Sequence, residues 1–444
     1  MFSSHKPTVC LLNLGCAKNL VDSEVILGKL SVSGYIPYPD AEKADIILIN
    51  TCGFIEAARR ESRRAIRRVL KFKQQDPAKV VGVIGCFVTK EREKLVRSFP
   101  EIDLWLGVKE LGQIVEAIEG KKLRAQRYTF LYGDKMPRLL STPKVWAYLK
   151  IAEGCSHACS FCTIPQIKGP YRSRQMASVI REAERLAESG VKEVILISQD
   201  TTYFGRDRKE RSELPRLLEK LIKIPKLAWV RWLYGFPEEV DDRLLEVMHD
   251  SKICPYFDLP FQHSHPRVLK LMRRGFDGSR ALKLVEKIRS RIPDAALRST
   301  LIVGFPGEGK KEFLDLARFV REAQFDHLGV FIYSAEPGTE AYSLGDPVPT
   351  AEKEQRRHEI MELQAEISRQ RLRRFHGQRL EVLFDGTTDS NQIFYLGRTK
   401  YQAPEVDGQV KLRQAGEMLF PRPGIYRVEI TRTSQYDLQG RFLG

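Results

Sequence analysis

Apolar runs alternate with helical patterns over roughly the first 125 residues. The runs at residues 8–14, 46–50 and 80–84 predict buried parallel strands. Stretches with helical periodicity at 22–30 and 55–72 lie between them. This alternation predicts an α/β domain over residues 7–123, in which helices cover a parallel sheet.

A second alternating series begins near residue 145, after a linker at 124–144 that carries two prolines. Helices are expected between its strands, for example at 178–189 and 279–291. Six such units predict a complete or partial β/α barrel, with chemistry at the carboxyl ends of the strands. The six predicted strands are 147–151, 194–198, 229–233, 256–259, 298–303 and 328–333. A long helix is expected at 350–375, stopped by Gly377, so this domain is assigned to 141–372.

The last part of the chain changes character. Short alternating runs are separated by glycine, proline, asparagine and aspartate, and they predict a small antiparallel barrel over 375–443. These runs lie at 380–384, 393–396, 409–412 and 426–431.

Three cysteines share one loop after the first barrel strand: Cys155, Cys159 and Cys162, spaced CxxxCxxC. A cubane iron–sulfur cluster has four irons, so three thiolates leave one iron open to another ligand. The alternative is a tetrahedral zinc site with His157 as the fourth ligand. That histidine lies between two of the cysteines on a tight loop, which is an awkward position from which to join them.

Cys16, Cys52 and Cys86 each follow a predicted strand of the first domain. Carboxyl ends of parallel strands meet at one edge of a sheet, so the three thiols are expected to converge. The alternative is three buried small residues, because free cysteine is often buried. Convergence would make a second cluster site with an open iron. Cys10 and Cys254 are expected to be structural.

The combined motifs resemble the radical S-adenosylmethionine (SAM) superfamily and its methylthiotransferase family. The resemblance rests on CSHACSFC with Phe161 beside its last cysteine, on GPYRSR at 169–174, and on NLGCAKNLVDSE, NTCGF and GC around the first three cysteines. It implies a flavodoxin-like first domain, a partial (β/α)6 radical SAM barrel and a final TRAM domain. It also implies two [4Fe–4S] clusters and two uses of SAM, one as methyl donor to sulfur and one as radical source.

Candidate SAM-binding residues come from the same comparison and from the strand ends. Gly304 and Pro306 in GFPGE resemble the GxP turn near the SAM adenine, although an ordinary turn explains them equally well. The other candidates are Phe161 and three residues at or near successive strand ends, Gln199, Gln262 and Arg298.

Two branches of the family differ in substrate. The residues AKNLVDSE after Cys16 resemble the RimO-type branch, which modifies the β-carbon of an aspartate in small-subunit ribosomal protein twelve. Ala17 stands where that branch usually has proline. Residues 199–202 and 258–263 are also closer to this branch. The alternative is the tRNA branch, which modifies an isopentenyl-adenosine and usually has Gln-Met-Asn after the cysteine.

Charge bears on the choice of partner. The net charge is +16, of which residues 1–144 carry +9 and residues 375–444 only +1. A basic chain favours nucleic acid, but a near-neutral final barrel is poor for gripping tRNA, so tRNA is not the expected partner. A basic ribosomal protein suits exposed acids in this barrel, expected at Asp385, Asp389, Glu405 and Asp407. A non-enzymatic, metal-bearing RNA-binding module remains the alternative from another class.

One predicted helix is rich in arginine: Arg59, Arg60, Arg63, Arg64, Arg67 and Arg68 fall within ten residues. They form one side of an amphipathic helix. The side is either a solvated face or a contact for ribosomal RNA or for an acidic, low-potential electron donor of flavodoxin or ferredoxin type.

Apolar runs in the chain stay well short of the ~20 residues that a membrane helix needs. The first residues lack a signal-peptide pattern. The sequence therefore predicts a cytoplasmic enzyme that does not contact a membrane.

Overall fold

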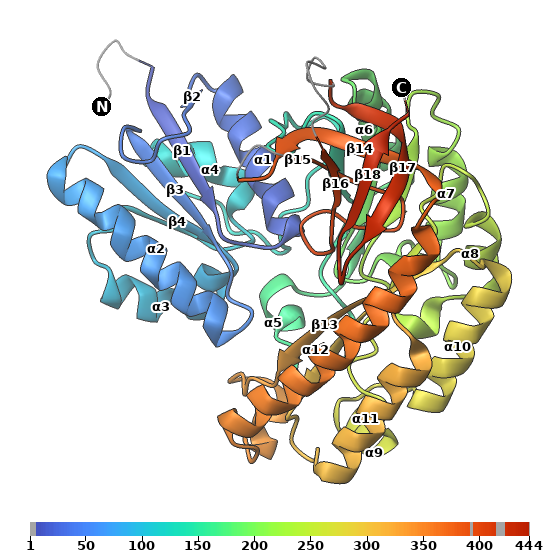
Figure 1. Cartoon of the computed structure of the whole chain (residues 1–444). Coiled ribbons are helices and arrows are strands. Elements are labelled where there is room, and N and C mark those ends of the chain that lie inside the picture. Colours follow the sequence, from blue (N-terminus) through green and yellow to red (C-terminus); the bar gives the residue numbers. More distant parts are fainter. Residues whose placement is uncertain (1–5, 391–393, 414–421, 444) are drawn as a thin grey trace.

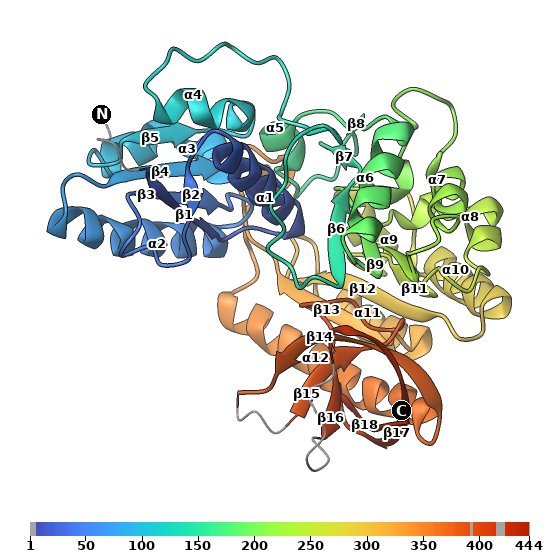
Figure 2. The same ribbon diagram turned by 90° about the horizontal axis from the view of Figure 1, so that it is seen from above.

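The structure is a computed structural model that describes residues 6–390, 394–413 and 422–443. It has three parts in chain order: an α/β domain, a partial β/α barrel and a small closed barrel (Figure 1). The α/β domain lies beside β6 (Trp146–Lys150), and the small barrel lies next to β13 (His327–Ile332) and α12 (Thr350–Leu372) (Figure 2).

The first domain is a five-stranded parallel sheet in the order β2-β1-β3-β4-β5. This is the strand order of flavodoxin-like folds, as expected. Helices α2 and α3 pack on one face of the sheet, and α1 and α4 pack on the other. The strands are β1 (Thr8–Asn13), β2 (Ile36–Pro37), β3 (Ile46–Thr51), β4 (Val80–Gly85) and β5 (Leu104–Leu106); the helices are α1 (Ala17–Val32), α2 (Glu56–Gln75), α3 (Cys86–Ser98) and α4 (Ile114–Ile118).

The central domain contains all six predicted strands, in two parallel three-stranded sheets, β10-β9-β6 and β11-β12-β13. A parallel bridge links Val230 of β10 to Ile253, just before β11, whereas no ladder in the described chain pairs the outer strands β6 and β13, so the barrel is partial. The remaining strands are β9 (Glu193–Ile197), β10 (Trp229–Trp232), β11 (Tyr256–Asp258) and β12 (Ala296–Val303). The remaining helices are α6 (Met176–Glu188), α7 (Leu214–Leu221), α8 (Asp242–Val247), α9 (Pro266–Leu271), α10 (Gly278–Arg291) and α11 (Lys310–Ala323).

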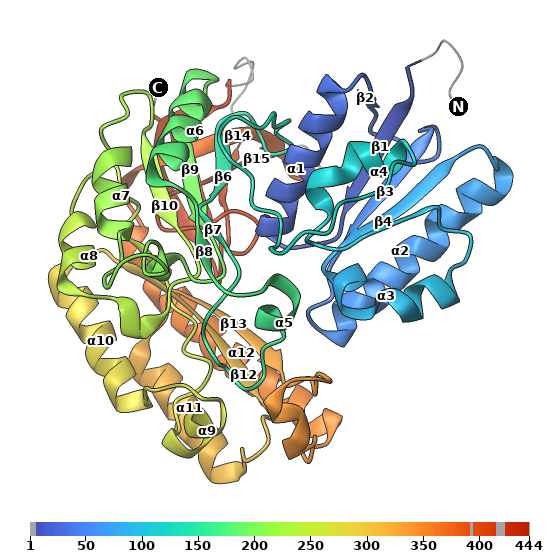
Figure 3. The ribbon, with the colours of Figure 1, turned by 180° about the vertical axis from the view of Figure 1, so that it is seen from behind.

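A short excursion follows β6 and carries the cysteine loop. It consists of an antiparallel pair, β7 (Ala152–Glu153) and β8 (Arg172–Ser173), with α5 (Ile164–Lys168) between them. Seen from behind, α5 lies between the first domain and the barrel (Figure 3). Single 3-10 turns are η1 (Leu111–Gln113), η2 (Thr201–Tyr203), η3 (Pro237–Glu239), η4 (Glu340–Leu344) and η5 (Arg373–Phe375), the last of which leads from α12 to Gly377 with φ +76°.

The C-terminal domain is a closed barrel in the order β14-β15-β16-β18-β17. Its strands are β14 (Arg379–Thr388), β15 (Phe394–Arg398), β16 (Val410–Arg413), β17 (Gly424–Thr433) and β18 (Leu438–Phe442). Four pairs are antiparallel as predicted, but β16 and β18 pair in parallel, because β18 turns back from β17 and closes the barrel against β16. Residue 393, the first of one predicted run, lies outside the described residues.

The expectation of four exposed acids in this barrel is wrong for Asp407. Its side chain is 1% exposed and accepts a hydrogen bond from the Tyr256 hydroxyl at 2.6 Å. Asp385 and Asp389 are half-buried. Glu405 is exposed, but its carboxylate accepts a hydrogen bond from the Tyr148 hydroxyl at 2.8 Å. Two of these acids therefore hold the small barrel against the central domain.

The arginine-rich helix α2 is not solvated along its whole basic side. Arg59 is buried, and its guanidinium lies 2.6 Å from the carboxylate of Glu336, which follows β13. Lys90 of α3 lies 2.8 Å from the same carboxylate. Arg63 is half-buried, and the other four arginines, Arg60, Arg64, Arg67 and Arg68, are exposed. Arg59 therefore joins two domains.

Membrane spans were sought among the helices of the described ranges. None of these helices is both long and apolar enough to cross a bilayer.

Candidate functional site: a six-cysteine cavity between two domains

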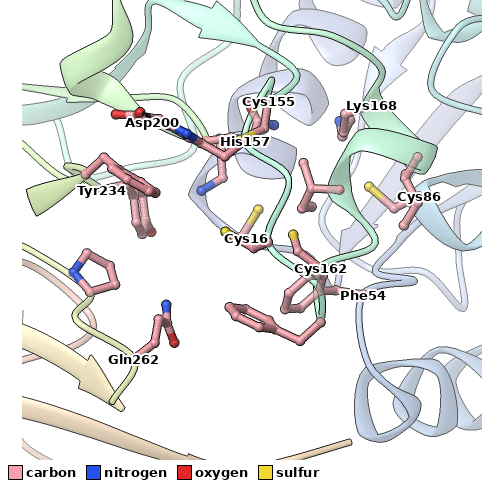
Figure 4. Close-up of a pocket in the computed structure, with 18 of the residues that line it drawn as sticks. Cys16, Phe54, Cys86, Cys155, His157, Cys162, Lys168, Asp200, Tyr234 and Gln262 are labelled. Carbon is pink, nitrogen blue, oxygen red and sulfur yellow. Dashed lines mark hydrogen bonds and ion pairs between the residues drawn. The ribbon is translucent and has the colours of Figure 1, made fainter. Parts of the chain in front are cut away.

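One cavity of about 320 Å³ lies between the first domain and the barrel. The carboxyl edge of the parallel sheet forms one wall, and the carboxyl ends of barrel strands form the other. All six predicted ligand cysteines line it: Cys16, Cys52, Cys86, Cys155, Cys159 and Cys162. In Figure 4, Cys16, Cys86 and Cys162 gather in one region, with Lys168 nearby.

The first-domain cysteines occupy equivalent places in the fold. Cys16 caps α1 after β1, Cys52 follows β3, and Cys86 begins α3 directly after β4. Asn19 supports this edge: its Nδ2 donates to the Thr51 carbonyl at 3.3 Å, and its Oδ1 lies 3.8 Å from the Cys86 sulfur. The convergence expected from a parallel sheet is therefore present.

The barrel cysteines lie on a loop that several backbone hydrogen bonds hold in place. The Cys155 N–H donates to the Gly169 carbonyl at 3.1 Å, and the Ser160 N–H donates to the Met272 carbonyl at 3.1 Å. Gly154 has φ +83°, and a Cβ there would lie 2.2 Å from the Pro170 carbonyl oxygen. Only glycine fits at this close approach, which sets the start of the loop.

Burial makes Cys86, Cys155 and Cys162 weaker acids than a free thiol. It raises the pKa of Cys155 to about 11 and that of Cys86 and Cys162 to about 12. A cysteine binds a metal group as the deprotonated thiolate. A bound cationic metal group therefore has to compensate the negative charge of these buried thiolates.

The donor set tests which metal group fits. Its six members all donate sulfur, the ligand chemistry of iron–sulfur clusters. Within the described residues, no group of three or more histidine, cysteine or acidic side chains is arranged to hold a single metal ion. The sulfur-only donor set is the kind that an iron–sulfur cluster would take from the chain.

His157, the fourth ligand of the zinc alternative, contacts other side chains of the barrel. His157 Nε2 lies 2.6 Å from Asp200 Oδ2, and its ring stacks on Phe236 with centroids 3.8 Å apart. Figure 4 shows the imidazole directed at Asp200. This arrangement disfavours His157 as a fourth ligand.

Three of the predicted SAM-binding residues, Phe161, Gln199 and Gln262, line the cavity. The Gln199 amide donates to Glu153 at 2.5 Å, while its Oε1 has no protein partner among the described residues. Gln262 has φ +70°, is fixed by its N–H to the Thr300 carbonyl at 2.8 Å, and likewise leaves Oε1 unpartnered within the described chain. Both oxygens can accept from a ligand.

The other three predicted residues lie outside the lining. Arg298 pairs with Asp258 at 3.3 Å and with Asp407 at 3.4 Å. Gly304 has φ +70° and faces Lys353, whose side chain a Cβ would meet at 2.3 Å, and Pro306 is buried beside it. This turn thus packs against α12, and direct SAM contact at these positions gains no support from the geometry.

Two buried lysines were not singled out by the sequence. Lys150 and Lys168 both pair with Asp22 of α1 and with Glu153 of β7, and all four side chains are at most 3% exposed. Although burial lowers the pKa of Lys168, the nearby Cys86, Glu153 and Asp22 raise it above its ordinary value. Lys168 therefore stays cationic beside the first-domain cysteines, which form the first cysteine set (Cys16, Cys52 and Cys86). In the sequence, the position of Lys168 directly before GPYRSR could have identified it as a site residue.

Arg274 brings a second cation to the barrel cysteines. Its guanidinium lies 3.7 Å from the Cys159 sulfur and 3.9 Å from the Phe236 ring centroid, and it donates to the Pro260 carbonyl at 2.8 Å. Each cysteine set thus has a cationic neighbour that offsets thiolate charge.

Comparison with known proteins agrees with this architecture. Three family profiles match in order: the uncharacterized protein family UPF0004 at residues 8–107, the radical SAM superfamily at 149–320 and the TRAM domain at 377–443. The chain is 44% identical over 432 residues to "Ribosomal protein uS12 methylthiotransferase RimO" of Aquifex aeolicus, covering 97% of this chain and 96% of that protein. It belongs to the RimO family of radical SAM proteins.

Other RimO relatives are similar over the same extent. The proteins of that name from Koribacter versatilis and Syntrophotalea carbinolica are 41% and 42% identical, over 98% and 99% of this chain and 96% and 98% of theirs. Among solved structures, the radical SAM methyltransferase TsrM from Kitasatospora setae superposes with a TM-score of 0.55 at 15% identity, covering 76% of this chain and 77% of that one. This likeness shows the fold that the RimO family shares with it.

Proposed function

We propose that this chain is a methylthiotransferase that adds a methylthio group to the β-carbon of an aspartate in ribosomal protein uS12. The observation that carries the proposal is the single cavity onto which cysteine sets from two domains open. The names of the RimO relatives supply the substrate.

The two sets are assigned to two [4Fe–4S] clusters: Cys155, Cys159 and Cys162 to the radical SAM cluster, and Cys16, Cys52 and Cys86 to an auxiliary cluster. When bound, these groups supply reductive cleavage of SAM and delivery of sulfur, respectively. Gln199 and Gln262 would offer acceptors to SAM, and Phe161, which lines the same cavity, would pack beside it.

The chain's own residues hold the two walls of the cavity together. The ion pairs of Asp22 and Glu153 with Lys150 and Lys168 join the walls on opposite sides. The lining is mainly apolar, so few protein groups would hold water beside bound SAM. A low-potential electron donor of flavodoxin or ferredoxin type is the proposed redox partner, and the ribosomal substrate assigns the reaction to the cytoplasm.

A paired anaerobic assay tests the proposal. Reconstituted enzyme, SAM, reductant and sulfide receive either uS12 or isopentenylated tRNA, and mass spectrometry looks for an added methylthio group. We expect modification of uS12 alone. Modification of tRNA alone would reverse the substrate assignment, and no SAM cleavage with either substrate would overturn the enzymatic function.

A further inference from the structure

Lys18 places an amino group in the cavity, and the described part of the chain gives it no acidic partner. It is the second residue of α1, two positions after Cys16, and it lines the cavity. Its Nζ lies 3.6 Å from the Tyr234 ring centroid and 3.5 Å from the Ser198 carbonyl oxygen. No carboxylate of the described residues comes within 4.0 Å of it.

The other buried lysines of the site differ. Lys150 and Lys168 are both paired with Asp22 and Glu153, so their charges are neutralised within the protein. Arg274 donates to a backbone carbonyl and lies against Cys159 on the barrel side. Lys18 belongs to the first domain but reaches the barrel wall, where one long contact to the Ser198 carbonyl leaves most of its three N–H donors free.

The position of this ammonium group is specified by a strained neighbour. Tyr234 has φ +64°, a conformation unusual for a bulky residue. Its N–H donates to Asp258 Oδ2 at 3.0 Å, and its carbonyl accepts from the Thr201 N–H at 2.8 Å. Such strain persists only where the surroundings impose it. Here it holds the aromatic ring against the lysine, where a cation–π contact supports the charge.

An ammonium group in a mainly apolar cavity is costly unless an anion joins it. The ring and one carbonyl replace part of its hydration, and the unfilled donors face the cavity. A ligand carboxylate would complete the set by charge-assisted hydrogen bonds.

We propose that Lys18 binds the side-chain carboxylate of the substrate aspartate and so selects an acidic residue for modification. The inference rests on the proposed function, because it takes the substrate to be an aspartate in a protein. The carboxylate carbon is bonded directly to the β-carbon. Holding the carboxylate at Lys18 therefore places the reacting carbon in the cavity that both groups of cysteines line.

SAM carries a carboxylate too, so the test separates the two sources. Reconstituted enzyme without reductant is titrated with a fluorescent uS12 peptide containing the aspartate, and with the same peptide containing asparagine. The proteins are wild type, Lys18→Met, Lys18→Arg and Lys71→Met, the last being a control on the exposed face of α2. Iron content and substrate-free SAM cleavage are measured for each.

Wild type, Lys18→Arg and Lys71→Met are expected to bind the aspartate peptide about tenfold more tightly than the asparagine peptide, the effect of one charge-assisted hydrogen bond. In Lys18→Met this preference falls to within about twofold, with iron content and the KM for SAM unchanged. If Lys18→Met takes up no iron, Lys18→Gln provides the same comparison.

An aspartate preference kept in the neutral variants overturns the inference. If the KM for SAM in substrate-free cleavage also rises about tenfold, the carboxylate at Lys18 is that of SAM. If the neutral variants keep the aspartate preference but wild-type enzyme modifies uS12, the inference about Lys18 fails and the proposed function stands. Wild-type enzyme that modifies no uS12 overturns both.

Discussion

Arg298 Nε lies 3.4 Å from Asp407 Oδ1, which joins a strand of the central barrel to the C-terminal barrel. The same guanidinium lies 3.3 Å from Asp258, whose other oxygen accepts from the Tyr234 N–H. Through these contacts the C-terminal domain supports the wall of the cavity behind Lys18. Arg298 is therefore a positioning residue. Its place near a strand end contributes to the docking of the two domains.

Replacing Asp407 tests this connection. Asp407→Asn leaves Arg298 with Asp258 as its remaining carboxylate partner and weakens the bond from the Tyr256 hydroxyl. Because Asp258 still offsets the guanidinium charge, the free energy of unfolding should fall by about 1–2 kcal/mol, less than for a buried charge left without any partner. The control is Glu381→Gln in the same barrel, whose side chain is 52% exposed beside Lys400 and should matter little. Equal urea midpoints for the two variants would contradict the assignment.

Arginines of α2 should respond to charge reversal according to their burial. The triple variant with Arg60, Arg64 and Arg68 changed to glutamate alters exposed side chains only and should unfold within about 0.5 kcal/mol of wild type. The single change Arg59→Glu places a carboxylate against Glu336 and should destabilise the protein severely. Thermal unfolding measures both. Comparable losses would show that the exposed face also supports the fold, and lost activity on ribosomal particles alone would indicate an RNA contact.

Acid should loosen the contact between the first domain and Glu336. Although burial raises the pKa of Glu336, hydrogen bonds from Arg59, Lys90 and Ser334 hold it below its ordinary value. A carboxylate of this kind stabilises the docked state above its unfolded pKa of about 4.3, and the stabilisation disappears as pH falls through the lower folded value.

Hydrogen exchange at α2 and α3, corrected for intrinsic rates, should therefore stay slow at pH 5 and rise below about pH 4. Glu336→Gln should show faster exchange at pH 7 and a smaller further rise in acid. The same acid dependence in wild type and variant would place the titrating group elsewhere.

The two cysteine sets should load metal independently. Changing Cys155, Cys159 and Cys162 to alanine should leave about four irons of about eight and abolish SAM cleavage. Changing Cys16, Cys52 and Cys86 should also leave about four irons but retain cleavage to 5′-deoxyadenosine. Iron analysis with electron paramagnetic resonance distinguishes the variants. Loss of all iron in either triple variant would mean that one shared site, not two, is formed.

Much of this site follows from local sequence patterns. The ends of β1, β3 and β4 are marked by apolar runs, and parallel strands bring their ends together, so the meeting of Cys16, Cys52 and Cys86 was predictable. The strands β2 and β5 have only two and three residues, too few to show a period. The partners of Arg59 and Arg298 could not be predicted, because Glu336 and Asp407 reach them from other domains through docking that no local pattern encodes.

The four buried charges of Asp22, Glu153, Lys150 and Lys168 lie where water and dissolved ions have little access. Mobile ions screen exposed charges over about 8 Å at physiological salt but act weakly on such a cluster. The separation of the two cysteine sets should therefore be insensitive to the ionic medium. A donor or substrate that docks by surface charge would respond to salt, whereas the internal spacing of the two groups of cysteines would not.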